Sequence, residues 1–232
     1  MTDSIKVSDL FTDIPPLLSE LFSSVIYPWE VIPKIRSIIE NLINEPPSGF
    51  TEYSKGVIIG DRVKIREGVT IMPGTVISSD AEIRQGAYIR GGVFIGEGAV
   101  VGHCCELKNS ILMSQAVAAH FNYVGDSILG CGAHLGAGVI LSNLKADKTE
   151  ITVHGESHFP TGLRKLGAII GDGGEVGCNA VLNPGSVIGK NSSVYPLTAW
   201  RGVLPSGYIA KRDNITVKKK QADSSERNTE LF

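Results

Sequence analysis

Several residue types and patterns are scarce in this sequence of 232 residues, and each shortage excludes a class of protein. Lysine and arginine total 22 against 24 acidic residues, so the net charge is −2 at pH 7. A dedicated nucleic-acid-binding protein would carry a basic excess. No window approaches the roughly 18 apolar residues of a membrane span. The opening MTDSIKVSDL, with two Asp residues, is not typical of a secretory signal. We therefore expect no nucleic-acid partner and no membrane association.

Cysteine is equally scarce, and its spacing is uninformative for metal or redox chemistry. The four cysteines contain no C-x-x-C pair: Cys104, Cys105, Cys131 and Cys178. Reduced thiols and a cytoplasmic location are the expectation for such a pattern. Aromatic residues make up only 6% of the chain, whereas glycine reaches 27 residues. This imbalance is unusual for a helical or mixed domain and indicates a repeat.

A repeat of six residues begins at Val57 and carries one bulky apolar residue in each unit. These residues are Ile59, Ile65, Ile71, Ile77, Ile83, Ile89, Ile95, Val101, Leu107 and Met113. The rhythm resumes later at Ile170, Val176, Leu182, Ile188, Val194 and Trp200. A small or β-branched residue stands two positions before each of these bulky residues. In a strand, alternate side chains point to the same side, so the small residue and the bulky residue both point inward and the residue between them points outward. A unit this short cannot bury its apolar residue alone, so successive units must stack into a solenoid.

This pattern resembles the hexapeptide-repeat family, which implies an all-β fold, a left-handed parallel β-helix with 18 residues per coil. Residues 56–204 would form about seven coils. We expect a helical segment over 1–50, the left-handed β-helix domain over 51–210 and a flexible tail over 211–232. The first region has apolar residues at helical spacing, and the last is polar without a period. The rhythm slips near 120–126 and stops over 143–167.

Breaks in the rhythm are the best places for a site, because a regular coil has no pocket. The segments AAHFNYVGD (118–126) and HLGAGVILSN (134–143) lie at such breaks. They resemble the acetyltransferase domain of the bifunctional N-acetylglucosamine-1-phosphate uridyltransferase/glucosamine-1-phosphate acetyltransferase. The exit RKLGAIIGD is also similar to the C-terminal β-helix of sugar-1-phosphate nucleotidyltransferases.

The resemblance implies that His120 is the general base. A neutral imidazole beside the acceptor amine would take its proton as the acetyl bond forms. Backbone N–H groups of residues 136–138 would meet the thioester oxygen as negative charge builds there. An isolated histidine would instead be interpreted as a turn or interface residue, but the surrounding motif favours the catalytic interpretation.

Arg90 and Lys108 match the two phosphate-binding cations of the family. They are 18 residues apart and each follows an inward residue, so both should point outward and stack one coil apart. Stacked cations repel unless an anion lies between them, and a sugar phosphate would serve. Arg66 and Arg84 share the same spacing without a family role. A solvated cationic ladder therefore remains an open alternative.

The remaining acceptor residues also come from the resemblance. Tyr123 and Asn143 match sugar-contacting residues, and both side chains can donate and accept hydrogen bonds. His134 stands where the family usually has Asn, which changes how the amine would be held. Lys148 is a candidate cation from the long loop.

Acetyl-CoA is the cosubstrate that the resemblance implies, bound along a groove between neighbouring subunits of a homotrimer. Ala137 and Cys178 match positions that contact it through the backbone, with a thiol at Cys178 in place of a small hydroxyl. Lys211 and Arg212 follow the last coil and are candidates for its phosphates. No metal is needed for this chemistry.

The function implied is therefore acetyl-CoA-dependent N-acetylation of an amino sugar phosphate, with glucosamine 1-phosphate favoured, in nucleotide-sugar and cell-envelope biosynthesis. Residues 1–50 contain one glycine and no nucleotide-binding loop. A separate uridyltransferase would then be required, or the helical segment is a docking or lid element. Two alternatives stay open: a γ-class carbonic-anhydrase-like zinc site using His154 and His158, and a non-catalytic trimeric scaffold.

Overall fold

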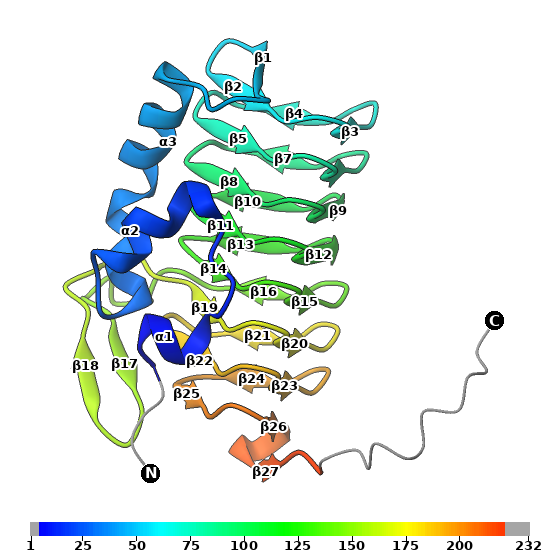
Figure 1. Cartoon of the computed structure of the whole chain (residues 1–232). Helices are drawn as coiled ribbons and strands as arrows, with labels where there is room; N and C mark the ends of the chain where they lie inside the picture. The colour runs from blue at the N-terminus through cyan, green and yellow to red at the C-terminus, as the bar shows by residue number, and fades with distance from the viewer. Residues whose placement is uncertain (1–4, 221–232) are drawn as a thin grey trace.

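The computed structural model describes residues 5–220 as a tall stack of coils with short helices along one side (Figure 1). Each coil contributes one short strand to each of three sheets, here named sheets A, B and C. Neighbouring coils pair in parallel, for example Ile77 with Ile95 in sheet A and Ile83 with Val101 in sheet B. The predicted fold class, a left-handed parallel β-helix with a short N-terminal helical segment, is confirmed.

The strands are two to four residues long. Sheet A contains β1 (Thr51–Ser54), β2 (Val57–Ile59), β5 (Thr75–Ile77), β8 (Val93–Ile95), β11 (Ser110–Leu112), β14 (Ile128–Leu129), β19 (Ala168–Ile170), β22 (Ser186–Ile188) and β25 (Val203–Leu204). Sheet B contains β3 (Lys64–Ile65), β6 (Glu82–Ile83), β9 (Val100–His103), β12 (Val117–His120), β15 (His134–Leu135), β20 (Glu175–Val176), β23 (Ser193–Val194), β26 (Tyr208–Ala210) and β27 (Thr216–Lys218). Sheet C contains β4 (Thr70–Ile71), β7 (Tyr88–Ile89), β10 (Glu106–Lys108), β13 (Tyr123–Gly125), β16 (Ile140–Leu141), β21 (Val181–Leu182) and β24 (Ala199–Trp200).

The interior of the β-helix is a column of the residues that the repeat predicted. The inward residues from Ile77 to Leu107 and from Ile170 to Trp200 are buried in one cluster together with the small residues between them. Sheet C has seven strands, which agrees with the seven coils expected. Stacking therefore buries what no single unit can bury.

The six-residue rhythm slips at the corner between sheets C and A in two successive coils. Leu112 points into the interior where the repeat predicted Met113, and Met113 packs against the helices instead. Each of these turns is one residue shorter because Asn109 and Asp126 adopt the left-handed conformation, both with φ of +47°. Asn and Asp tolerate that conformation better than other side chains do. The first slip lies earlier than the one expected over residues 120–126.

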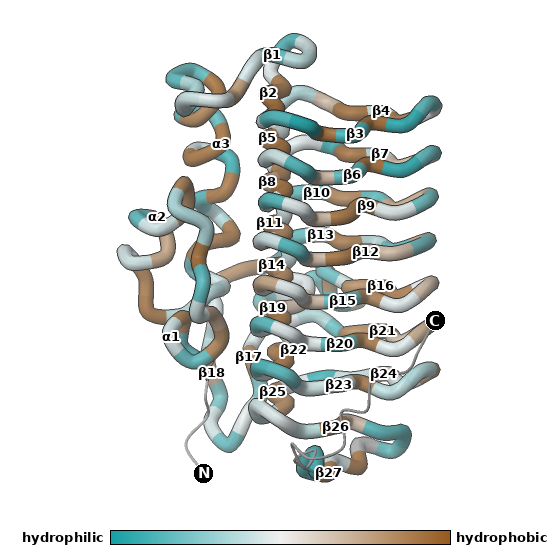
Figure 2. The backbone as a smooth tube through the Cα atoms, turned by 45° about the vertical axis from the view of Figure 1, so that its right-hand side comes forward, coloured by the Kyte–Doolittle hydropathy of each residue, from teal (hydrophilic) through white to brown (hydrophobic). Residues whose placement is uncertain are grey.

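The helical segment covers the outer face of sheet A. It consists of α1 (Val7–Leu10), the 3₁₀ helix η1 (Pro16–Leu18), α2 (Ser19–Ser23), η2 (Pro28–Lys34) and α3 (Ile35–Asn44). A second core forms where the middle residues of the sheet A strands meet these helices: Ile58, Val76, Phe94, Ile111, Ile128, Ile169 and Val187. Figure 2 shows this hydrophobic column beside the helices. Sheets B and C carry polar residues at many of the matching positions and face away from the helices.

The long loop leaves the stack after β16 and forms the antiparallel hairpin of β17 (Thr152–His154) and β18 (His158–Pro160). Within the predicted tail, Arg212–Asn214 form the 3₁₀ helix η3, and β27 pairs antiparallel with β26. The rest of that predicted tail, residues 221–232, lies outside the described residues. Across the described part of the chain, no helix has the length and apolarity to cross a bilayer.

Candidate functional site

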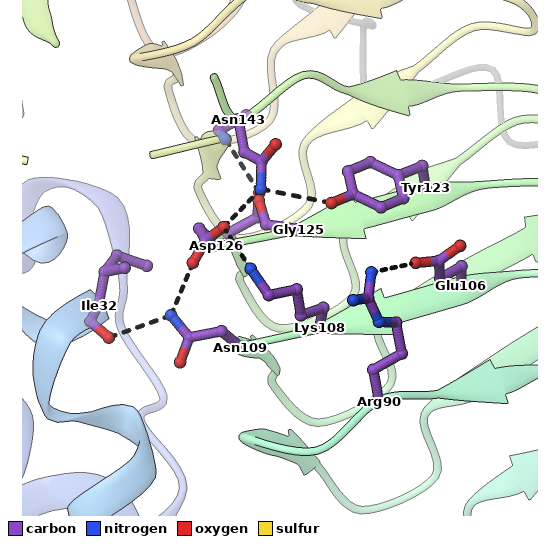
Figure 3. A network of polar contacts seen from close by, with 11 residues as sticks. Ile32, Arg90, Glu106, Lys108, Asn109, Tyr123, Gly125, Asp126 and Asn143 are labelled. Carbon is purple, nitrogen blue, oxygen red and sulfur yellow. Dashed lines mark hydrogen bonds and ion pairs between the residues drawn. The ribbon is translucent and has the colours of Figure 1, made fainter. Parts of the chain in front are cut away.

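A polar cluster lies at the corner between sheets C and A, centred on the buried carboxylate of Asp126 (Figure 3). Asn109 donates from Nδ2 to Asp126 Oδ1 at 2.8 Å, and Asn143 donates from Nδ2 to Oδ2. The Lys108 ammonium lies 3.6 Å from Asp126 Oδ2, and its side chain is 18% exposed. The tight turns of two coils and the start of the long loop bring these four residues together. Asp126 thus holds both Lys108 and Asn143 in place.

The Tyr123 ring lies over this cluster, in space that a side chain at Gly125 would otherwise occupy. Asn143 donates from Nδ2 to the Tyr123 phenol oxygen at 3.3 Å. A Cβ at Gly125 would come within 2.6 Å of the same phenol oxygen, so glycine there makes room for the ring. Burial, and then the negative charges of Asp126 and Glu106, raise the pKa of Tyr123. The phenol therefore stays protonated, and its own hydrogen is available to a ligand.

Arg90 and Lys108 stack as predicted, but each has its own carboxylate. Arg90 donates from Nη1 to Glu106 at 2.8 Å, and this hydrogen bond raises the pKa of the guanidinium. The residues two positions before them, Tyr88 and Glu106, are direct partners in sheet C. The repulsion expected between the stacked cations is thus relieved within the protein, and the stacking alone does not require a bound anion.

The pair Arg66 and Arg84 is also neutralised within the protein, here by one carboxylate that both arginines share. Both guanidinium groups contact Glu82, at 3.1 and 3.4 Å. Desolvation acts to raise the pKa of Glu82, but the hydrogen bonds and positive charges of the two arginines together lower it. Arg66 and Arg84 thus form an exposed ladder of cations that a carboxylate of the protein neutralises.

His120 lies at a different edge, the corner between sheets B and C. It ends β12, is exposed and is in register with His103 one coil earlier. Its backbone carbonyl accepts from the N–H of Gly138, which ties it to the next coil. Among the described residues its ring has no hydrogen-bond partner, whereas His103 Nδ1 donates to the carbonyl of Gln85 at 2.8 Å. A free, exposed imidazole can accept a proton from a ligand.

The predicted residues for the thioester and for CoA follow the same corner. Gly136 and Gly138 already donate their N–H groups to the carbonyls of Val176 and His120. Of the three amides predicted to face the thioester oxygen, Ala137 is the one without a partner among the described residues. Asn179 N–H donates to the Ala137 carbonyl, so Cys178 lies one coil further along this corner and is exposed.

The last coil brings one predicted basic residue toward this corner. Lys211 Nζ lies 5.4 Å from the centre of the Tyr195 ring, which is 44% exposed. Such a cation–π contact positions the ammonium without neutralising it. Arg212 is exposed in η3 next to it.

The other predicted acceptor residues lie outside the Asp126 cluster. His134 is exposed on sheet B, between Val117 and Glu175 in register. Lys148 adopts a left-handed conformation in the long loop, and its carbonyl accepts from Arg164. The structure therefore brings Lys108, Tyr123 and Asn143 together, places Lys148 in a cavity that Asp126 also lines, and leaves His134 on another sheet.

The two histidines of the zinc alternative face each other across the hairpin. Their ring centres are 4.9 Å apart, and His154 Nε2 is 3.0 Å from Arg201 Nη2. Burial, and then Arg201, lower the pKa of His154. Within residues 5–220 no group of three or more His, Cys, Asp or Glu side chains is placed to hold a metal.

Sequence reasoning missed Asp126, Asn109 and Glu106. Asp126 stood at the end of the segment 118–126, so its presence was visible but its role was not. Its neighbour in the stack, Asn109, comes 17 positions earlier, and the shortened coil that aligns them becomes evident only from the register. Glu106 stands two positions before Lys108, on the same outward face of β10.

Comparisons with known proteins place these features in context. Residues 71–158 match the family model described as the GMPPB C-terminal domain. A bifunctional protein GlmU of Methanococcus maripaludis is 36% identical over 211 residues, covering 88% of this chain and 51% of that protein. A bifunctional sugar-1-phosphate nucleotidylyltransferase/acetyltransferase of Sulfurisphaera tokodaii is 34% identical over 174 residues, covering 73% of this chain and 43% of that protein.

Solved structures are more distant. A mutant of AntD, an N-acyltransferase from Bacillus cereus solved in complex with dTDP and coenzyme A, is 15% identical with a TM-score of 0.40. That alignment covers 75% of this chain and 93% of the AntD chain. The chain spans about half the length of the curated relatives it matches. The resemblance to the hexapeptide-repeat acetyltransferases of the GlmU type and to sugar-1-phosphate nucleotidyltransferases, predicted from the hexads and the His120 motif, is confirmed by these relatives.

Proposed function

We propose that this protein is an acetyl-CoA-dependent N-acetyltransferase whose acceptor is an amino sugar phosphate, with glucosamine 1-phosphate as the favoured substrate. One observation carries the proposal: Lys108, Tyr123 and Asn143 converge on one corner of sheet C around the Asp126 carboxylate. A cation, a phenol and a carboxamide together suit a phosphate and sugar hydroxyls. Relatives named as bifunctional nucleotidylyltransferase/acetyltransferases support the same assignment.

His120 acts in this proposal as the general base. It comes three residues before Tyr123, at the other edge of sheet C, and its ring has no partner among the described residues. The acceptor amine attacks the thioester carbonyl, the imidazole takes the amine proton, and the CoA thiolate leaves and regains a proton. Ala137 supplies the free N–H that stabilises the charge developing on the thioester oxygen.

Acetyl-CoA would lie along the corner between sheets B and C, past Ala137 and Cys178 toward Lys211 and Arg212. A homotrimer would complete this groove. Exposed apolar side chains support it, because Phe121 and Leu197 are each 56% exposed near this corner. The helices cover sheet A, so sheets B and C are the faces left for other copies. We place the enzyme in the cytoplasm.

Release of free CoA thiol from acetyl-CoA tests the proposal. The wild-type protein should release thiol with glucosamine 1-phosphate and form the N-acetylated sugar, seen as an added acetyl group by mass spectrometry. Glucosamine without the phosphate should require a much higher concentration. N-Acetylglucosamine 1-phosphate is the control, because its amine is already blocked. Thiol release that no amino sugar stimulates would refute the proposal, and equal use of glucosamine and its phosphate would refute the phosphate site.

A further inference from the structure

A groove runs between the helical segment and the corner of sheets C and A. Its central cavity, of about 260 Å³, is lined by Ile32, Pro33, Arg36, Lys108, Asn109 and Asp126. A cavity of about 480 Å³ adjoins it through Arg36 and reaches Arg90. A third, of about 510 Å³, adjoins it through Asn109 and Asp126 and reaches Lys148. The two walls of the groove thus come from different parts of the chain, η2 and α3 on one side and the coils on the other.

The groove carries an excess of positive charge. Its lining cations are Arg36, Arg90, Lys108, Lys148, Arg164 and Lys165, against the carboxylates of Glu40 and Asp126. Within residues 5–220 the ion pairs account for Arg90 and Lys108, and none includes Arg36. The Arg36 guanidinium therefore keeps its N–H donors free of any ion pair, and such donors suit the oxygens of an anion.

Arg36 is held in this position by packing. It lies in the first turn of α3, and its stem covers Gly92, where an added Cβ would come 3.3 Å from Arg36 Cγ. The preceding helix η2, which runs directly into α3, is tied to the corner because Asn109 Nδ2 donates to the Ile32 carbonyl at 3.4 Å, as Figure 3 shows. Arg36 is therefore part of the groove wall, and its side chain is exposed.

Lys108 faces the same cavity from the opposite wall. Its ammonium is 3.6 Å from Asp126 Oδ2, which is longer than a charge-assisted hydrogen bond of about 2.7–2.9 Å. The ammonium has three N–H donors and this one loose partner among the described residues, so donors remain for a ligand. A phosphate group can bridge two such cations, with two oxygens on the guanidinium and one on the ammonium.

We propose that Arg36 of the helical segment and Lys108 of the β-helix together bind the phosphate group of the acceptor in this groove. This inference rests on the proposed function for the identity of the acceptor, and it gives the helical segment a direct part in the substrate site. Arg90, paired tightly with Glu106, then forms the far edge of the groove and is not the primary phosphate ligand.

The test compares Arg36→Ala with Lys34→Ala. Lys34 is an exposed cation two residues earlier that contacts Ser24 and does not line the three cavities. Loss of a charge-assisted contact should raise KM for glucosamine 1-phosphate roughly 10- to 100-fold in Arg36→Ala, with kcat and KM for acetyl-CoA little changed. Arg36→Lys should recover part of the loss, and Lys34→Ala should match the wild type. Equal KM values in Arg36→Ala and the wild type would overturn the inference.

Inorganic phosphate separates this inference from the proposed function. Its dissociation constant is measured by calorimetry for the wild type, Arg36→Ala and Lys34→Ala, without any sugar. Binding that weakens at least about tenfold in Arg36→Ala alone supports the site even if no amino sugar is acetylated. Binding that is the same in all three proteins, or absent in the wild type, refutes the site even if acetyl transfer is observed.

Discussion

Replacing Asp126 with Asn removes the carboxylate around which the Asp126 cluster is built. The change keeps the size of the side chain and suits the left-handed backbone at this position, φ +47°. It removes the counter-charge of Lys108, and it places an amide NH₂ against donors from Asn109 or Asn143. Charge-assisted hydrogen bonds contribute about 1.5–3 kcal/mol each, so we expect a loss of about 2–4 kcal/mol in the free energy of unfolding.

Thermal denaturation followed by circular dichroism measures this loss. For a chain of this length it corresponds to a fall in Tm of about 4–16 °C. Asp80→Asn is the matched control. Asp80 also has a left-handed turn conformation, but its side chain is 40% exposed and its carboxylate pairs with Arg62 at the surface. Its Tm should barely change. Equal Tm shifts in the two variants would refute the argument that Asp126 organises the corner.

Three further predictions follow from other contacts. Gly125→Ala should push the Tyr123 ring off the Asp126 cluster and raise KM for the acceptor in steady-state kinetics. Adding Tyr123→Phe to Gly125→Ala should cause little further rise in this KM. Burial raises the pKa of Cys131 to about 11, and its thiol donates to a backbone carbonyl. At pH 8 Cys131 should therefore react with a disulfide reagent at least roughly tenfold more slowly than the exposed Cys104. Comparable rates of the two thiols, measured by peptide mapping, would contradict this. Phe94→Ala should cost about 3–5 kcal/mol, measured by urea denaturation, because it opens a cavity between sheet A and the helices; an unchanged midpoint would mean that the helices do not depend on this contact.

The period of the sequence made the β-helix predictable, because each hexad needs its neighbours to bury its apolar residue. The covered face was also readable in principle. Ile58, Val76 and Phe94 are apolar at outward positions spaced 18 residues apart, and Val187 continues the series after the long loop. The exact register at the corner of sheets C and A could not be predicted from the sequence. A turn with one residue fewer makes Leu112 the inward residue and a full turn makes Met113 the inward residue, and both residues are apolar.

The candidate site divides in the same way. Motif resemblance identified Lys108, Tyr123 and Asn143, which the structure brings together around Asp126. It did not identify the intramolecular partners, because Glu106 and Asp126 become neighbours of the cations only through the register of stacked coils. The position of Arg36 depends on how the helices pack on sheet A, a contact between distant segments that no local pattern encodes.

The rate of acetyl transfer by His120→Asn is the most direct test of the central claim, that the imidazole at the B–C corner takes the proton of the acceptor amine. Asn keeps some hydrogen bonding but does not accept the proton at neutral pH. With glucosamine 1-phosphate and acetyl-CoA, kcat should fall roughly 10²- to 10⁴-fold while the dissociation constant for acetyl-CoA and the Tm stay near the wild-type values. A folded His120→Asn protein that retains the wild-type kcat would contradict the account.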